Sequence, residues 1–169
     1  MNCACIRGTG RKFDFYLDLL DCDTVVFIDQ SNWMDEDYYT IPDEYPMTIT
    51  FPNGTKKSVN FKPRSATIFT SQDLGMPFLL DGIYCFTVES CGYTYSRNDG
   101  IVCSLECKLD TLTHQLETSL VYGKELLSKI ERLTVYMDSF KTNARLGKIN
   151  RATKLFKILS RELEGIDCL

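Results

Sequence analysis

The chain has 169 residues, of which 44% are hydrophobic and 25% are charged, and its formal net charge is −4. This composition excludes a disordered chain, because it supplies enough apolar side chains for one domain or one domain with an appendage. No apolar run reaches the roughly 18–20 residues of a membrane-spanning helix, and residues 1–10 lack the apolar stretch of a secretory signal. We therefore expect a soluble protein that is made in a cytosol and has no membrane partner.

The first hundred residues show the alternation and the turn residues of short β-strands. Runs of β-branched and aromatic residues predict seven strands, over residues 24–29, 47–51, 58–61, 66–70, 83–89, 93–96 and 101–109. Hairpin turns are expected at Pro52-Asn53-Gly54 and at Asn98-Asp99-Gly100. Many short strands joined by such turns favour an antiparallel β-sandwich, with a jelly-roll-like arrangement as the closest type.

Residues 29–46 are acidic and aromatic, have no sustained period and contain the single tryptophan, Trp33. A connection of this length in a compact domain is usually functional or poorly ordered. Two interpretations remain open for it. It is either a surface segment whose aromatic residues pack back on the sandwich, or a loop that contacts a partner.

From Leu109 onward the apolar spacing changes to three and four residues, which is the pattern of an amphipathic helix. The pattern is interrupted near Gly123 and breaks at residues 143–147, and a second stripe runs from Ile149 to Leu163. The sequence thus predicts an α+β fold, with a β-sandwich domain over residues 1–108 and an arm of two helices over residues 109–169. A small sandwich need not cover so long an apolar edge, so we expect the stripe to contact another subunit through Leu112, Leu116, Leu120, Leu127, Ile130, Leu133, Met137, Leu155 and Leu159.

Charge also divides the chain. Residues 1–100 carry 14 acidic and 8 basic side chains, a net −6, and residues 101–169 carry 9 acidic and 11 basic ones, a net +2. A basic face is predicted near the end of the chain, formed by Lys141, Arg145, Lys148, Arg151, Lys154, Lys157 and Arg161. Such a face suits nucleic acid, an anionic membrane, an acidic protein partner or water alone. Phe156 is the one aromatic residue within it, so base-specific reading is not expected.

Catalytic chemistry finds little support in the sequence. The single His114 falls in a predicted helix, the acidic pairs fall in predicted loops, and no phosphate-binding glycine loop is present. The eight cysteines are expected to be thiols at synthesis, and none has the paired CxxC spacing of a zinc site. In the predicted strand 101–109, Cys103 and Cys107 alternate with leucines as small apolar residues, although a metal site remains the alternative. We predict no catalytic, cofactor-binding or metal-binding residue, and no enzyme.

Two motifs carry a family resemblance. The pattern DGxYxFT begins at Asp81, and the pattern CxLxCKLDxL begins at Cys103. Over about residues 78–165 the chain resembles the ring proteins of the neck and tail barrel of crAss-like tailed bacteriophages. The resemblance implies a sandwich with a helical extension, without catalytic residues or cofactors, assembled in the bacterial host cytoplasm as a homo-oligomeric ring.

In the virion, the resemblance places such a ring beside the portal or adjacent ring and tail proteins, where it joins the capsid to the tail and lines the channel through which DNA leaves. Non-specific proximity to packaged DNA is part of that expectation. The alternative is a non-enzymatic binding module whose basic C-terminal helix contacts nucleic acid or an anionic surface.

Overall fold

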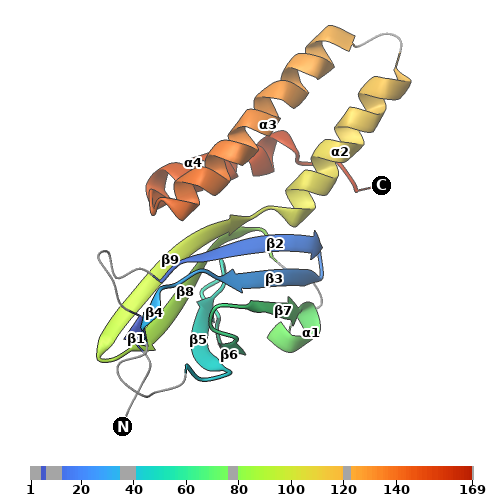
Figure 1. Cartoon of the computed structure of the whole chain (residues 1–169). Helices are drawn as coiled ribbons and strands as arrows, with labels where there is room; N and C mark the ends of the chain where they lie inside the picture. The colour runs from blue at the N-terminus through green and yellow to red at the C-terminus, as the bar shows by residue number, and fades with distance from the viewer. Residues whose placement is uncertain (1–4, 7–12, 35–40, 76–79, 120–122, 169) are drawn as a thin grey trace. The chain divides into compact units, whose positions relative to one another are not determined.

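A computed structural model of the chain describes residues 5–6, 13–34, 41–75, 80–119 and 123–168 (Figure 1). The chain forms two compact units. The sandwich unit comprises residues 1–79 and 84–97, and the helical unit comprises residues 80–83 and 98–169. Antiparallel sheets come first in the chain and helices follow, so the α+β class is confirmed.

Two sheets make up most of the β structure (Figure 1). The first has the order β2-β3-β7, formed by Phe15–Asp21, Thr24–Asp29 and Ala66–Thr70. The second has the order β6-β5-β8-β9, formed by Lys56–Phe61, Tyr45–Thr50, Gly82–Ser90 and Tyr93–Ile101. The short strands β1 (Cys5–Ile6) and β4 (Trp33–Met34) pair with each other.

Aromatic side chains fill the space between the two sheets. Phe27 on β3 is fully buried, and its ring centroid lies 4.9 Å from that of Phe15 on β2. It also lies 5.4 Å from the ring of Phe61 and 5.9 Å from that of Phe86, which belong to the second sheet. Because these rings join the inner faces of both sheets, the predicted β-sandwich is confirmed.

One of the two predicted hairpin turns is found in the structure, and the other is not. The turn at Pro52-Asn53-Gly54 joins β5 to β6, with Gly54 at a φ of 84°. The expected turn at residues 98–100 is wrong, because these residues lie inside β9. The chain turns instead at Cys91 and Gly92, whose φ angles of 50° and 79° are those of a two-residue type I′ hairpin.

The predicted strand over residues 101–109 is also wrong. The helix α2 begins at Cys103 and runs to Thr118, so the leucines Leu105, Leu109 and Leu112 share a helix face rather than a strand face. Apolar residues that recur every second position in a short run also recur every fourth position. The run at residues 101–109 therefore fits both a strand and a helix, and its sequence alone does not distinguish them.

Three long helices follow β9 rather than two. After α2, Ser119 is extended with φ −100° and ψ 128°, which ends the helix, and α3 spans Gly123–Arg145. The last helix, α4, spans Ile149–Glu162, and a short helix, α1 (Ser71–Leu74), precedes β8 in the sandwich unit. Figure 1 shows α2 and α3 as an antiparallel pair with α4 folded back along α3. The turn before α4 uses Gly147 at a φ of 72°.

Candidate interaction surfaces

The outer face of the sheet β2-β3-β7 carries apolar side chains that are open to solvent. Paired residues of antiparallel strands share a face, and the register places Tyr16 opposite Ile28 and Val26 opposite both Asp18 and Ile68. Tyr16 is 48% exposed and Ile68 is 59% exposed. We call this surface the outer sheet face and define it by Tyr16, Asp18, Val26, Ile28 and Ile68.

Antiparallel sheets with one solvated face normally alternate apolar and polar residues. Strand β3, with the sequence TVVFID, is apolar on both faces, since Val25 and Phe27 are buried within the sandwich while Val26 and Ile28 belong to the outer sheet face. A strand that is apolar on both sides is typical of a sheet covered on both sides. The apolar residues on both faces of β3 are visible in the sequence and indicate a covered outer face, although the run was interpreted only as a strand.

The β2–β3 hairpin adds negative charge beside this apolar surface. Leu20, at the irregularity between Leu19 and Asp21, is 61% exposed. Asp18, Asp21 and Asp23 are all exposed. Among the described residues, no ion pair involves any of these three carboxylates. The hairpin thus joins an exposed leucine to a cluster of exposed acids.

Most of the predicted subunit-contact stripe lies inside the helical unit. Its core consists of Val102, Leu105, Leu109, Leu112, Leu133, Met137, Phe140, Ala144, Ala152, Leu159 and Leu163. The predicted contact residues Leu112, Leu133, Met137 and Leu159 belong to this core, and Ile130 and Leu155 pack against it. The three helices bury Leu112, Leu133, Met137 and Leu159 against one another, so these four side chains are not available to a neighbour in this fold.

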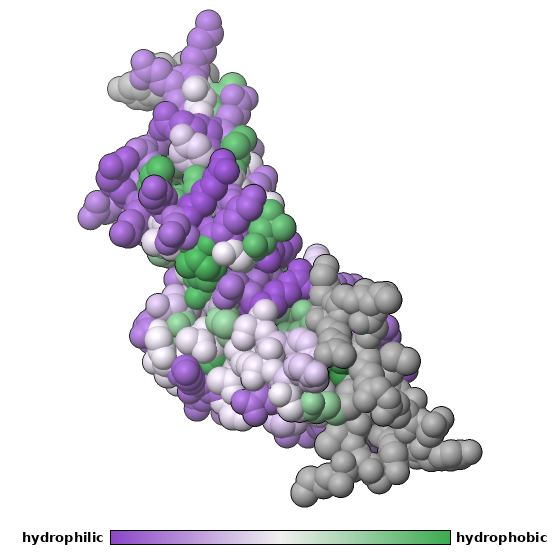
Figure 2. All heavy atoms as spheres, turned by 90° about the vertical axis from the view of Figure 1, so that its left-hand side faces the viewer, coloured by the Kyte–Doolittle hydropathy of each residue, from purple (hydrophilic) through white to green (hydrophobic). Residues whose placement is uncertain are grey.

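The remaining stripe residues are distributed differently. Leu116 is partly buried, Leu127 is 45% exposed, and Leu120 lies outside the described residues. Other exposed apolar side chains of the helical unit are Val135 on α3 and, at the α3–α4 turn, Leu146 and Ile149. The face of the helical unit in Figure 2 is mostly hydrophilic, with hydrophobic residues in separate groups.

The predicted basic face divides into paired and unpaired charges. Lys141 forms an ion pair with Glu106, and Arg145 Nε lies 2.9 Å from Asp99 Oδ1, so both join α3 to other parts of the helical unit. The other members are all exposed: Lys148, Arg151, Lys154, Lys157 and Arg161. Arg161 has Glu162 at 3.8 Å. In the part of the chain that the structure describes, no acid pairs with the other four, and we call Lys148, Arg151, Lys154 and Lys157 the α4 basic face.

A buried carboxylate organises the start of the acidic segment. Asp29, 4% exposed, accepts hydrogen bonds from Trp33 Nε1 at 2.5 Å, from the Ser31 N–H at 3.0 Å and from the Arg64 N–H at 2.9 Å. The Arg64 guanidinium donates in turn to the Trp33 carbonyl. Trp33 is fully buried, and its ring centroid lies 4.9 Å from that of Tyr45, so these aromatic residues pack on the sandwich, as the first interpretation of this segment predicted. Residues 35–40 of the segment lie outside the described residues.

Replacing Asp29 by alanine should lower the free energy of unfolding by about 2–3 kcal/mol, because two buried N–H donors and the part-buried N–H of Arg64 lose their acceptor. Trp33 is the only tryptophan, so its emission should shift to longer wavelength as water reaches the indole. Urea denaturation followed by fluorescence measures both effects. Asp43→Ala, at an exposed carboxylate of the same segment, is the matched control and should change stability by less than about 0.5 kcal/mol. Equal effects of the two substitutions would contradict the assignment.

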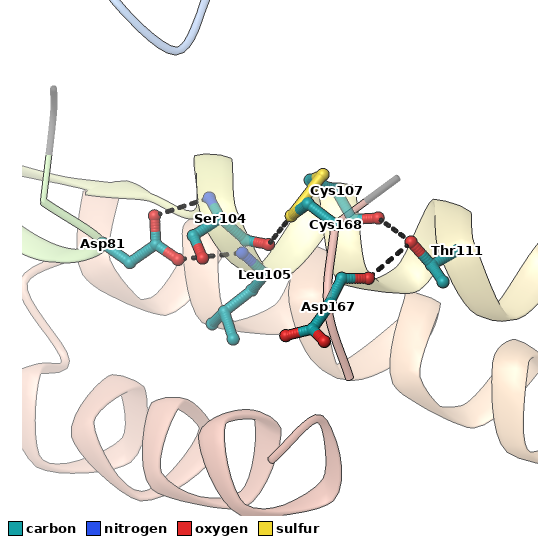
Figure 3. Close-up of a disulfide and its surroundings, with 7 residues drawn as sticks. All are labelled: Asp81, Ser104, Leu105, Cys107, Thr111, Asp167 and Cys168. Atoms are coloured by element: carbon teal, nitrogen blue, oxygen red, sulfur yellow. Dashed lines mark hydrogen bonds between the residues drawn. A yellow bond between two sulfur atoms is a disulfide. The ribbon is translucent and has the colours of Figure 1, made fainter. Parts of the chain in front are cut away.

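The first turn of α2 is capped from outside the helix. Asp81 Oδ1 accepts from the Ser104 N–H at 2.9 Å, and Asp81 Oδ2 accepts from the Leu105 N–H at 2.9 Å (Figure 3). These are two of the N–H groups that a helix start leaves without a partner. Burial raises the pKa of Asp81 above its ordinary value of 3.8, and the hydrogen bonds from Ser104 and Leu105 oppose that shift.

The raised pKa of Asp81 predicts a definite sign of pH dependence. The folded state holds the Asp81 proton more tightly than the unfolded state, so this proton stabilises the fold below pH 3.8, and the contribution is lost as pH rises through the raised value. The unfolding free energy of the native chain minus that of Asp81→Asn should therefore decrease as pH rises through this window. Urea denaturation at a series of pH values measures the difference. An increase would mean that the hydrogen bonds from Ser104 and Leu105 lower the pKa of Asp81 by more than burial raises it.

A disulfide joins Cys107 on α2 to Cys168, with the Cα atoms 5.4 Å apart (Figure 3). Beside it, the Thr111 hydroxyl donates to the Asp167 carbonyl at 2.9 Å. Three further cysteines are disulfide-bonded, namely Cys22, Cys91 and Cys103. These five residues are therefore not thiols in the folded chain, and Cys103 and Cys107 lie on a helix rather than on the expected strand face.

The described residues contain no group of three or more His, Cys, Asp or Glu side chains that would hold a metal ion. His114 is exposed on α2. An open pocket of about 570 Å³ lies within the helical unit, lined by Gln115, Thr118, Ser119, Glu125, Leu126 and Lys129. No helix in the described ranges has both the length and the apolar character needed to cross a membrane.

Comparison with known proteins adds no identification. A scan against protein-family models, a search of curated proteins and a search of solved structures each found no match to this chain.

Proposed function

We propose that this chain is a non-enzymatic structural protein of a phage virion. In this proposal, copies of the chain assemble into a closed ring that joins the capsid portal to the tail and lines the DNA-exit channel. The observation that carries the assembly is the outer sheet face, where the exposed Tyr16 and Ile68 adjoin the partly buried Val26 and Ile28 of the strand between them. The resemblance of the DGxYxFT and CxLxCKLDxL motifs to phage ring proteins supports the place in the virion.

The physical argument is the cost of leaving this surface in water. Burial of apolar area contributes about 25 cal/mol per Å², so a contact that covers Tyr16, Val26, Ile28 and Ile68 is favourable. Contiguous exposed apolar surface of this kind marks protein contacts more often than scattered single residues do. Most of the helical stripe that the sequence assigned to a neighbour lies in or against the core of the helical unit, so the outer sheet face is the larger apolar surface left for a contact.

Native mass spectrometry of the purified full chain tests the proposal. We expect a closed oligomer with one defined copy number, and electron microscopy of the same sample should show rings. Binding of the assembled chain to purified portal or tail proteins of the same phage tests the virion assignment. A chain that stays monomeric at high concentration and binds none of those proteins would overturn the proposal.

The α4 basic face favours a second candidate function, non-specific binding of DNA. Lys148, Arg151, Lys154 and Lys157 are exposed and have no acidic partner among the described residues. Four such contacts to phosphates would give a slope of about −3.6 for log K against log salt concentration, at roughly −0.9 per phosphate.

A fluorescence titration with a labelled DNA duplex at several salt concentrations measures this slope. Replacing the four residues by alanine should abolish the salt-dependent binding. Binding that is unchanged by these replacements, or absent in the native chain at low salt, would eliminate this function.

A further inference from the structure

We propose that the α4 basic face and the α3–α4 turn of one copy dock onto the outer sheet face and the β2–β3 hairpin of the next copy. This inference rests on the proposed ring assembly and names the two surfaces that form its repeated contact. The occupant of the outer sheet face is thus a second copy of this chain.

The first surface combines apolar and acidic side chains. Tyr16, Ile68 and Leu20 are each about half or more exposed, and Val26 and Ile28 lie between the strands that carry them. Asp18 lies within this surface opposite Val26. Asp21 and Asp23 follow the exposed leucine at the hairpin. The Asp21 carboxylate accepts from the Asp23 N–H at 2.8 Å, and the Asp23 carboxylate accepts from the Ser71 hydroxyl at 3.2 Å. The three carboxylates therefore keep most of their charge available to a cation from outside.

The second surface has the opposite charge and its own apolar residues. Lys148 at the N-cap of α4 and Arg151, Lys154 and Lys157 within the helix are spaced three residues apart, and this spacing places Lys154 and Lys157 opposite the buried Ala152 and Leu159. Next to Lys148 in the sequence, Leu146 is 63% exposed and Ile149 is 37% exposed. The α3–α4 turn thus presents two apolar side chains beside a row of cations.

The two surfaces carry opposite charges, and both carry exposed apolar side chains. Each has exposed apolar side chains next to unpaired charges, three acids on one and four bases on the other. Complementary charges favour the correct partner and fix its orientation, while apolar contact supplies affinity. A DNA duplex would satisfy the cations, but it offers nothing to Leu146, Ile149 or the apolar residues of the outer sheet face. A second copy satisfies all of these groups.

The surfaces belong to different units of the chain, so the contact is head-to-tail. Each copy uses its basic surface on one neighbour and its acidic surface on the other. A contact of this type closes into a ring when the rotation between neighbours divides a full turn. Two-fold pairing, which requires the same patch on both partners, does not use these surfaces.

Charge reversal in the full chain tests the contact. One variant carries Asp18→Lys and Asp21→Lys, and a second carries Arg151→Glu and Lys154→Glu. Each brings like charges together, so each should weaken self-association at least about tenfold, measured by analytical ultracentrifugation. A third variant with all four reversals restores opposite charges across the contact, and its self-association should return to within a few-fold of the native value.

Two controls reverse the same number of charges elsewhere on exposed positions. Lys56→Glu with Lys124→Glu matches the basic variant, and Asp110→Lys with Glu117→Lys matches the acidic variant. Both should assemble like the native chain. Circular dichroism identifies any variant that fails to fold, and the four-reversal variant keeps the test decisive, because a folding defect in either pair would persist in it.

The outcomes separate this inference from the proposed function. If the native chain forms rings and either reversed pair leaves them intact, or if the controls dissociate equally, the assigned contact is wrong while ring assembly stands. Loss of binding to a labelled DNA duplex without loss of self-association in the Arg151→Glu, Lys154→Glu variant would assign α4 to nucleic acid instead. A native chain that remains monomeric overturns the ring itself.

Discussion

Replacing Phe27 by alanine is expected to lower the unfolding free energy of the sandwich by about 3–5 kcal/mol. Phe27 is completely buried, and its ring lies within 6.2 Å, between centroids, of the rings of Phe13, Phe15, Phe61, Phe69 and Phe86. The substitution leaves a cavity bordered by rigid rings from both sheets, which collapse poorly. Urea denaturation followed by the fluorescence of Trp33, which belongs to the same unit, measures the change.

A matched control separates core packing from general sensitivity of this sheet. Ile68→Ala removes an apolar side chain from β7 at a position that is 59% exposed. At protein concentrations below those of self-association, it should change the unfolding free energy by less than about 0.5 kcal/mol. A Phe27→Ala effect below about 1 kcal/mol would contradict the assignment of this ring cluster as the sandwich core.

The second large effect concerns the packing of Phe140 against Gly100 in the helical unit. Phe140 is fully buried, and a Cβ added at Gly100 would lie 2.6 Å from Phe140 Cε1. Phe140→Ala should cost about 3–5 kcal/mol through the cavity that it leaves. Gly100→Ala should cost about 1–3 kcal/mol, because a buried ring must shift. Thermal unfolding followed by far-ultraviolet circular dichroism measures both.

The double variant tests whether these two residues act through one contact. Phe140→Ala frees the space that the new Cβ needs, so the combined cost should be smaller than the sum of the single costs by at least about 0.5 kcal/mol. Val135→Ala, 63% exposed on the same helix, is the control and should have little effect. Additive costs would mean that the two substitutions act independently.

The strands of the sandwich were predicted more accurately than the boundary between β9 and α2. Strands β3 and β7 were predicted with the observed bounds, because their β-branched and aromatic runs are flanked by turn residues. The start of α2 was misread because Leu105 and Leu109 satisfy both a strand spacing and a helix spacing. What favours the helix is Asp81, which caps it from a distant point in the sequence, and no local pattern contains that contact.

The candidate surfaces were predicted only in part. The exposed bases on α4 follow directly from residue type and helical spacing, whereas the pairing of Arg145 with Asp99 depends on how α3 meets β9. The helical stripe was assigned to a neighbour because the sequence does not say how helices pack on one another. The outer sheet face was missed because strand β2, with Tyr16 and Leu20 among its outward residues, has apolar side chains on both faces and hides the alternation.

The bond between Cys107 and Cys168 closes a covalent loop around the whole of α3 and α4. A protease that cuts after an exposed basic residue at the α3–α4 turn, such as Lys148, would divide the backbone inside that loop. The two fragments should then migrate together on a denaturing gel run without reductant and separate once reductant is added. Nicked protein would accordingly pass unnoticed in any preparation judged by non-reducing electrophoresis alone.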